Sequence, residues 1–300
     1  MRFCAALHTD RVDLGEEFVS GEGVATVAQA LEDAGFDAAF VTEHPFPDDG
    51  YLGYLGHHAL DPFVTLATVA AATTRLRMMT HICVVPYHNP YVLAKTVATL
   101  DVLSGGRVIL GCGAGYMATE FAAVGAPFED RNERFDAAIG AMKQAWSGES
   151  VRVEGSGATH TMRPMPVQRP HPPIWIGGNS RRALRRAVEL GDGWDGFANT
   201  AERAAYNRTP ELDTLDRLKR LLDDLHEYEH ENGRTVRDIA FSLLGLEPYG
   251  TKGWDAAAFR ETIAEYEKLG VTMTLVNIPA RSRDEYCDLV TSFGSELLGP

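Results

Sequence analysis

Short runs of apolar and β-branched residues alternate along the whole chain with longer segments whose apolar positions recur at helical spacing. The short runs predict strands over Arg2–Leu7, Ala38–Val41, Leu76–Val84, Val108–Gly111, Ile174–Ile176, Gly193–Asp195, Asp238–Leu243 and Thr272–Val276. The longer segments predict helices over Gly23–Ala34, Asp61–Thr73, Pro90–Leu103, Arg131–Trp146, Arg181–Leu190, Leu212–Glu231, Asp255–Lys268 and Arg283–Leu298. Strands that alternate with helices are typical of βα units and a parallel sheet. Eight such units predict an α/β fold of the (β/α)8 TIM-barrel type.

The ends of the expected helices carry residues that favour them. Asn89-Pro90 places a capping side chain before a proline whose missing N–H costs nothing at the first helical position. Ser104-Gly105-Gly106 supplies residues that tolerate a left-handed backbone at a helix end. These local signals agree with the alternation.

One interval between strands is unusually long, because about 60 residues separate the fourth expected strand from the fifth. Within it, residues 151–154 and 159–162 flank a Gly-Ser-Gly turn and predict a small β-hairpin. Residues 164–173 contain five prolines and predict an extended connector. We therefore expect residues 1–300 to form a single barrel domain with an insertion at about 148–173, between strand 4 and strand 5.

The net charge of the chain excludes some classes of binding partner. Its 28 basic and 42 acidic residues give a formal net charge of −14, which repels phosphate backbones and anionic lipids, so no nucleic-acid or membrane partner is expected. No apolar run approaches the roughly 18 residues typical of a membrane span. The four cysteines stand singly, unlike a zinc site or a secreted disulfide framework, and we expect a cytoplasmic protein.

Candidate chemistry gathers where the expected strands end, since TIM-barrel active sites lie at the carboxyl ends of the strands. The residues at these ends are His8, Glu43, His44, Thr80, His81, Gly111–Tyr116, Gly177–Ser180, Phe197, Asn199 and Asn277. Barrel metal sites use histidines two residues apart or carboxylates on several strand ends, and this pattern is missing. No metal is expected.

Two glycine-rich segments follow strands. Residues 174–180, Ile-Trp-Ile-Gly-Gly-Asn-Ser, lead into a helix whose positive end suits a phosphate, although an ordinary tight turn explains the motif equally well. Arg181, Arg182, Arg185 and Arg186 come next, and a solvated helix face accounts for most of them. Residues 111–116, Gly-Cys-Gly-Ala-Gly-Tyr, lack the spacing of a dinucleotide-binding fingerprint. Glycines there favour close approach of a flat ring to the backbone.

A set of motifs in chain order resembles the luciferase-like monooxygenase superfamily, over roughly residues 35 to 197. The motifs are Asp61-Pro62, Thr73-Thr74-Arg75-Leu76, Pro86-Tyr87-His88-Asn89-Pro90, Ala94-Lys95, Leu100-Asp101, Leu103-Ser104-Gly105-Gly106-Arg107, Gly111–Tyr116, Glu120-Phe121, Gly125-x-Pro127-Phe128-x-x-Arg131, Pro173–Ser180 and Asp192-Gly193-Trp194. Within that superfamily the sequence is most similar to the actinobacterial branch of oxidoreductases that use the deazaflavin coenzyme F-420.

The resemblance implies a barrel whose mouth holds the ring system of the cofactor. It implies cofactor-binding roles for His44, Thr80, His81, Gly113, Gly115, Tyr116, Gly177, Gly178, Asn179 and Ser180, with the phosphate at the last four. It also implies a non-prolyl cis peptide at about Thr80-His81, and a catalytic role for His44 at the reactive edge of the ring. In the sugar-phosphate dehydrogenase branch a glutamate acts as proton donor at the position of Ala114, so here the acid is unassigned.

The resemblance further implies hydride transfer between F-420 and an organic substrate. An apolar or ring-bearing substrate would suit the aromatic residues near the mouth, Phe46, Tyr51, Tyr54, Tyr116 and Phe197. Two alternatives are a two-component monooxygenase that uses reduced FMN and a flavin-binding protein without turnover. A full-length loop at 45–60 favours a substrate lid over the non-catalytic alternative. Implied partners are a small-molecule substrate, a separate reductase that supplies reduced cofactor, and a second copy in a homodimer.

Overall fold

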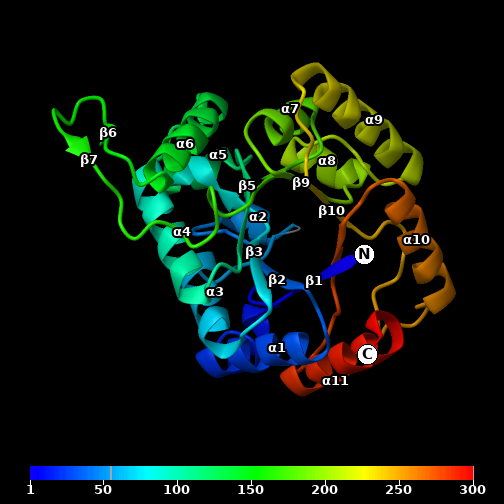
Figure 1. Ribbon diagram of the computed structural model, residues 1–300. Coiled ribbons are helices and arrows are strands. Elements are labelled where there is room, and N and C mark those ends of the chain that lie inside the picture. Colours follow the sequence, from blue (N-terminus) through cyan, green and yellow to red (C-terminus); the bar gives the residue numbers. More distant parts are fainter. Residues whose placement is uncertain (55, 300) are drawn as a thin grey trace.

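A closed parallel barrel ringed by helices forms the centre of the computed structural model, which describes residues 1–54 and 56–299 (Figure 1). Its strands are β1 (Arg2–Ala6), β2 (Ala38–Val41), β3 (Arg77–Thr80), β4 (Cys83–Val84), β5 (Val108–Gly113), β8 (Ile174–Gly177), β9 (Gly193–Gly196), β10 (Asp238–Ser242) and β11 (Met273–Val276). The order β3-β2-β1-β11-β10-β9-β8-β5 closes through pairing of β3 with β5, and β4 pairs with β5 beyond β3. The predicted (β/α)8 barrel is confirmed.

The eight long helices pack around the barrel (Figure 1). They are α1 (Gly21–Asp33), α3 (Pro62–Ala72), α4 (Pro90–Ser104), α6 (Arg131–Trp146), α7 (Arg181–Glu189), α9 (Leu215–Asn232), α10 (Ala256–Lys268) and α11 (Arg283–Phe293). Asn89 caps α4 through bonds from two backbone N–H groups, and Gly105 ends it with φ 67°, as its sequence signals predict. Among the described residues, no helix is both long and apolar enough to cross a membrane.

Shorter elements that the periodicity did not predict lie at the ends of these units. They are a 3-10 helix at Val12–Glu17, α2 (Asp49–Leu52), a 3-10 turn at Val85–Tyr87, α5 (Ala118–Ala123), α8 (Ala201–Asn207) and a π turn at Gly294–Leu298. Each has only three to seven residues, which is too short for a helical period to show in the sequence. Four of them contribute to the site described below: α2, the 3-10 turn at Val85–Tyr87, α5 and α8.

Most predicted boundaries lie within one or two residues of the observed ones, and three differ by more. The third strand does not run unbroken over Leu76–Val84, because the chain bends between β3 and β4 at a non-prolyl cis peptide. This bond joins His81 to Ile82, one residue beyond the expected place. The helix predicted from Leu212 begins at Leu215, since the Leu212 backbone bridges to Asn199. The last helix ends at Phe293, where the π turn begins.

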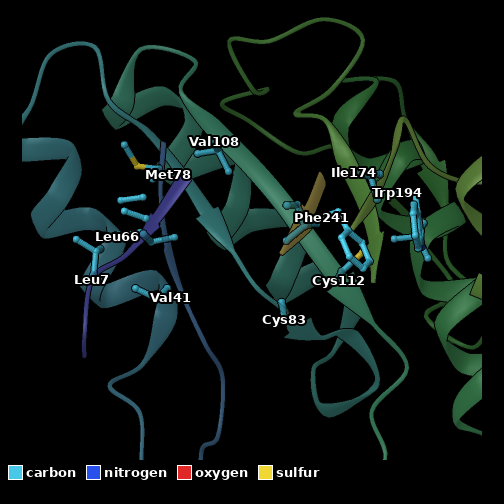
Figure 2. Close-up of a cluster of buried hydrophobic side chains, with 14 of the residues drawn as sticks. Leu7, Val41, Leu66, Met78, Cys83, Val108, Cys112, Ile174, Trp194 and Phe241 are labelled. Carbon is cyan, nitrogen blue, oxygen red and sulfur yellow. The ribbon is translucent and has the colours of Figure 1, made fainter. Parts of the chain in front are cut away.

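Alternating strand residues supply two apolar clusters. The larger one lies between the barrel and its helices, and Figure 2 shows part of it, including Val41 of β2, Leu66 of α3 and Met78 of β3. The smaller one is formed by Cys4, Ala38, Met79, Ile109, Trp175, Ala240, Met273 and Leu275, together with partly buried Phe40. Since strand side chains alternate between the two faces, the smaller cluster fills the barrel interior. The open end of the barrel is left for a ligand.

The predicted hairpin insertion is present as β6 (Val151–Arg152) and β7 (Thr159–His160), which pair in antiparallel fashion. It projects away from the barrel beside α4 and α6 (Figure 1). The proline-rich connector that follows is held to α4 by Asp101, whose buried carboxylate accepts from the N–H groups of Val167 (2.7 Å) and Gln168 (2.9 Å). The insertion therefore has its own anchor on the barrel.

Candidate active site

A cavity of about 380 Å³ opens where the strands end. Its wall includes eight of the ten predicted site residues: His44, His81, Gly113, Gly115, Tyr116, Gly177, Gly178 and Ser180. The volume lies within the roughly 300–1,000 Å³ typical of small-molecule and cofactor sites. Residues from four separate strand ends therefore come together as the barrel geometry requires.

Thr80 and Asn179 are not part of the cavity wall. Their side chains instead bond to backbone groups that support it. The Thr80 hydroxyl donates to the carbonyl of Gly111 at 2.7 Å. The side-chain amide of Asn179 donates to the backbone carbonyl of Phe197 at 2.8 Å, and its oxygen accepts from the backbone N–H of Phe197 at 3.2 Å. Asn179 thus joins the loop after β8 to the loop after β9. For these two residues the geometry indicates support of the wall and no direct contact with a ligand.

The predicted aromatic wall is only partly present. Tyr51, Tyr116 and Phe197 line the cavity, whereas Phe46 and Tyr54 are 71% and 52% exposed and lie outside it. The expectation for Phe46 and Tyr54 was wrong because both belong to the loop at 45–60, whose path the sequence pattern does not define. Leu55 of that loop lies outside the described residues.

The glycines of the cavity make room for a protein side chain. A Cβ at Gly113 would lie 2.6 Å from Cδ1 of Ile82, and one at Gly177 would lie 2.7 Å from the same atom. Ile82 follows the cis peptide and lines the cavity between these two glycines. Close approach to the backbone is therefore required here, as predicted, but Ile82 occupies the space beside the two glycines. The sequence contained no signal for Ile82.

His44 is held on both sides of its ring. Its Nδ1 lies 3.2 Å from Oε2 of Glu120, and its Nε2 lies 3.0 Å from the hydroxyl of Tyr51. Glu120 also accepts from the Tyr87 hydroxyl at 2.9 Å and from the N–H of Phe46 at 3.1 Å. A carboxylate can only accept, so it places the ring proton on Nδ1 and leaves Nε2 to exchange a proton with Tyr51.

Glu120 is charged in this setting although it is only 1% exposed. Burial alone would raise the pKa of Glu120, but the bonds from His44, Tyr87 and Phe46 outweigh burial and lower it. Glu120 comes from the short helix α5, 76 residues from His44 in sequence. Its Glu-Phe motif was noted in the sequence, yet nothing in its spacing indicated contact with His44.

A second histidine pairs with a buried carboxylate. Nδ1 of His81 lies 2.8 Å from Oδ2 of Asp195, which is fully buried on β9. Burial favours the neutral ring, but the charge and hydrogen bond of Asp195 outweigh it and raise the pKa of His81. Among the described residues the other carboxylate oxygen, Oδ1, has no hydrogen-bond partner. This pair puts a titratable cation in the cavity wall.

Arginines gather where the cavity meets the start of α7. Arg131, Arg182 and Arg208 line this end, and burial, then the charges of Arg208 and Arg182, lower the pKa of Arg131. Within the described part of the chain, none of the three forms an ion pair with a carboxylate. By contrast, Arg186 also lines the cavity but is paired with Asp136 at 2.6 Å. Of the four predicted helix arginines, only Arg182 and Arg186 face the cavity; Arg131 and Arg208 were missed.

One cluster that reaches the cavity wall through Glu43 has the composition of a metal site. One ligand atom each from Glu43, Cys83 and His88 lies within 4.8 Å of the others. Both Glu43 oxygens already have partners, because the Val84 N–H donates at 2.6 Å and His88 Nε2 lies at 2.8 Å. Burial, followed by the charge of Glu43, raises the pKa of the Cys83 thiol far above its usual range, which disfavours the thiolate that binds metals. The contacts explain the cluster as support for the strand break at β4.

Comparison with known proteins identifies the barrel. A family model for luciferase-like monooxygenases matches residues 2–248. The chain belongs to this family. Luciferase-like proteins of this kind are flavin- or deazaflavin-dependent oxidoreductases or monooxygenases, and this chain is an enzyme of that class.

Relatives of this luciferase-like enzyme use two kinds of cofactor. The F420-dependent glucose-6-phosphate dehydrogenase of Beutenbergia cavernae is 31% identical over 260 residues, which cover 80% of this chain and 69% of that protein. The FMNH(2)-dependent dimethylsulfone monooxygenase of Pseudomonas putida is 28% identical over 217 residues, which cover 70% and 54%. The coenzyme F420-dependent tetrahydromethanopterin reductase of Methanopyrus kandleri has a TM-score of 0.70 at 18% identity, covering 99% and 98%, and shows the shared fold.

The residues of this luciferase-like cavity fit a flat ring with an anionic tail. Ile82, which packs against Gly113 and Gly177, offers an apolar surface to a ring. Gly178 has φ 111°, a conformation that glycine adopts without strain, and Ser180 caps α7 beside it. The positive end of α7 and the unpaired arginines suit a phosphate.

Proposed function

We propose that this enzyme is a deazaflavin (F-420)-dependent oxidoreductase that transfers a hydride between the coenzyme and an organic substrate. The observation that supports this choice is the group of three unpaired arginines, Arg131, Arg182 and Arg208, at the phosphate end of the cavity. In a chain of net charge −14 such a group is suited to a ligand with several negative charges. The deazaflavin coenzyme has a longer anionic tail than FMN.

The bound coenzyme would supply the hydride chemistry, while the protein supplies position and charge. Gly177, Gly178 and Ser180 would hold its phosphate, with Asn179 bracing their loop. His81, Gly113, Gly115 and Tyr116 would lie along the ring, and Thr80 would support the strand end behind them. His44 would orient the substrate or exchange a proton at the reacting edge, because Glu120 holds its Nδ1 and leaves Nε2, which bonds to the Tyr51 hydroxyl, as the ring atom that can exchange a proton.

The proposed substrate is apolar or ring-bearing. Tyr51, Tyr116 and Phe197 present aromatic surface to the cavity, and Ile82 adds an aliphatic side chain. Aromatic walls with a few placed polar groups are typical of pockets for such molecules. The loop at 45–60 brings Tyr51 to the cavity, which favours turnover over a non-catalytic flavin-binding role.

We further propose that the enzyme acts as a homodimer through the outer face of α3 and α4. Val64, Val92 and Leu103 on this face are 71%, 64% and 66% exposed. Helix α3 has no charged residue, so two copies of an acidic chain can meet there without repulsion between like charges. Light scattering of the wild type against a V64E/V92E double variant tests this: a monomeric wild type would contradict it.

The proposal also covers the domain organisation of the enzyme, its location in the cell and its reductase partner. Residues 1–300 would act as one barrel domain with its insertion at about 148–173, in the cytoplasm, where the four free cysteines stay reduced. A separate reductase would supply the reduced coenzyme. A pull-down that returned no reductase activity, combined with direct reduction of bound coenzyme by this enzyme alone, would argue against that partner.

Coenzyme titration tests the central proposal. The purified enzyme is titrated with the deazaflavin coenzyme and with FMN, each oxidised and reduced, and binding is followed by fluorescence or calorimetry. We expect tight deazaflavin binding and FMN binding at least tenfold weaker. Preference for reduced FMN would support the two-component monooxygenase instead, and binding of neither would contradict the cofactor site.

A further inference from the structure

The reduction of an organic substrate by hydride transfer also needs a proton, and the sequence resemblance leaves the acid unassigned, because Ala114 stands where the sugar-phosphate dehydrogenase branch has a glutamate. We propose that Tyr51 is the proton donor of this enzyme and that the His44–Glu120 pair recharges it. The inference rests on the proposed oxidoreductase function and deepens it, because it assigns the acid that the sequence left open.

Tyr51, His44 and Glu120 form a continuous hydrogen-bonded line from the cavity into the protein. The Tyr51 hydroxyl lies 3.0 Å from Nε2 of His44, and Nδ1 of the same ring lies 3.2 Å from Glu120. Tyr51 lines the cavity, whereas Glu120 does not and is sealed by Tyr87. A proton on the His44 ring therefore has one partner facing the substrate space, Tyr51, and one buried acceptor, Glu120.

Burial keeps the members of this line in suitable charge states. It raises the pKa of Tyr51 to about 12, so this side chain remains a phenol with a proton to give at neutral pH. The lowered pKa of Glu120 keeps it a carboxylate that stabilises a positive ring next to it. The other titratable groups packed around Tyr51 and His44 are Asp48, Tyr116, Tyr206 and His57, and burial lowers the pKa of His57. Asp48 accepts from the Tyr51 N–H and from Thr119, so among the described residues Glu120 is the carboxylate that bonds to the His44 ring.

The fold positions Tyr51 through α5, the helix that carries Glu120. Asp48 caps α2 by accepting from the Tyr51 N–H at 2.9 Å, and its other oxygen accepts from the Thr119 hydroxyl at 2.6 Å. Glu120 meanwhile accepts from the N–H of Phe46. Two adjacent residues of α5 thus hold the loop at two points and fix Tyr51 beside His44.

The proposed step balances as follows. The substrate gains a hydride and its two electrons from the reduced coenzyme, so a C–H bond forms and a π bond of the substrate breaks. The Tyr51 O–H bond breaks as its proton bonds to the atom that received the π electrons. Tyr51 takes a proton from Nε2 of the His44 imidazolium, and solvent later returns a proton to that ring. The coenzyme is oxidised, the substrate is reduced, and Tyr51 is unchanged.

Histidine ¹⁵N NMR of the unliganded protein tests the proton line without any cofactor or substrate. The samples are the wild type, Tyr51→Phe, Glu120→Gln and a matched control, Tyr206→Phe, whose ring stacks on Tyr51 with centroids 6.0 Å apart. A His44→Asn sample assigns the signals. We expect the neutral His44 ring to carry its proton on Nδ1. Glu120→Gln should shift the Nδ1 signal of this ring, because the charge-assisted bond to the carboxylate is lost.

In the same spectra Tyr51→Phe should alter the Nε2 signal of His44, and Tyr206→Phe should alter neither ring nitrogen. A ring protonated on Nε2 when neutral, or an Nδ1 signal unaffected by Glu120→Gln, would overturn the recharging role of the pair. An Nε2 signal that ignores Tyr51→Phe would overturn the donor assignment itself. The NMR experiment tests the Tyr51 proposal even if the wild type binds no deazaflavin. In that case only the proposed function fails.

Stopped-flow oxidation of the reduced deazaflavin by 2-cyclohexen-1-one tests the step directly. We expect Tyr51→Phe to slow the reaction by about 10²-fold and to reduce its solvent deuterium isotope effect to near unity, with coenzyme affinity kept within about threefold. Tyr206→Phe should stay within about twofold of the wild type. A Tyr51→Phe enzyme as fast as the wild type would overturn the donor role while leaving the oxidoreductase function intact. If the wild type does not accept this probe, the NMR result decides.

Discussion

The two ends of the cavity satisfy their polar groups in different ways. At one end His44, Glu120 and Tyr51 bond to one another, and Glu120 accepts three hydrogen bonds within the protein. At the other end, within the described part of the chain, neither Arg131 nor Arg182 forms an ion pair with a carboxylate, and both line the cavity. Groups that are already paired hold a fixed geometry and can pass a proton, whereas unpaired cations attract an anion that the protein does not contain. The contrast separates a reacting end from a binding end.

The largest expected effect comes from removing the centre of the reacting end. His44→Ala should lower turnover by about 10²- to 10⁴-fold, the usual contribution of an acid–base group, while coenzyme affinity changes little. Turnover and coenzyme fluorescence titration measure the two effects separately. His58→Ala is the matched control, since His58 is an exposed histidine of the same loop and lies outside the cavity wall. Equal activity of His44→Ala and His58→Ala would show that the reacting end lies elsewhere.

The next largest effect should appear at the binding end. Here coenzyme affinity should fall, whereas in His44→Ala it is turnover that falls. The double variant Arg182→Ala/Arg208→Ala should weaken deazaflavin binding by about 10- to 100-fold, because each charged contact with a ligand contributes roughly 1.5–3 kcal/mol and part of this is screened by solvent. The loss should shrink as salt concentration rises. Calorimetry at two salt concentrations measures both.

Arg185→Ala is the control for that experiment, because it removes the same charge from α7 while Arg185 packs over Tyr228 outside the cavity. The control should bind like the wild type. A salt-independent loss, or an equal loss in the control, would mean that the arginines act through general charge and not as a binding end.

Between the two ends, the cavity wall needs glycine at position 177, which leaves room for Ile82. A side chain added there should have a smaller effect than the changes above. In Gly177→Ala the new Cβ would meet Ile82 at 2.7 Å (Cδ1) and 2.9 Å (Cγ2). Overpacking of this kind typically costs about 1–3 kcal/mol of stability. Gly140→Ala in α6 is the control, since no atom lies within 4 Å of its Cβ, and it should gain roughly 0.5–1 kcal/mol. Urea unfolding compares them; an unchanged Gly177→Ala would show that Ile82 yields freely.

The sequence predicted the framework far better than the reacting end. Strand and helix periods, the Asn89 cap and the Gly105 stop are local, so they can be recognised without knowing the fold. The contact of Glu120 with His44 joins residues far apart in sequence, and it exists only because the barrel brings α5 beside the loop after β2. Arg208 reaches the cavity from the end of α8, a helix of seven residues without a detectable period. Such contacts follow from closure of the barrel and not from any local pattern.

The smallest expected effect concerns His81 and Asp195 in the wall between the two ends. Burial lowers the pKa of His81, but Asp195 outweighs burial and the net shift is upward. A folded-state pKa above the unfolded value, about 6.5, means that the stabilisation is fully present below that pH and is lost as the pH rises through the folded pKa. His81→Gln keeps a donor toward Asp195 but cannot titrate. The stability of the wild type relative to His81→Gln should therefore fall as the pH rises above about 6.5, by an amount on the order of 1 kcal/mol.

Urea unfolding of both proteins at several pH values measures this difference. His226→Gln serves as the control, because His226 is more than half exposed and bonds to Glu229 on the surface, where such pairs contribute little. Its difference from the wild type should stay nearly constant over the same range. A His81→Gln difference that is flat or grows with pH would mean that Asp195 does not hold a charged ring. The positive charge that the cavity presents to a cofactor would then come from the arginine end alone.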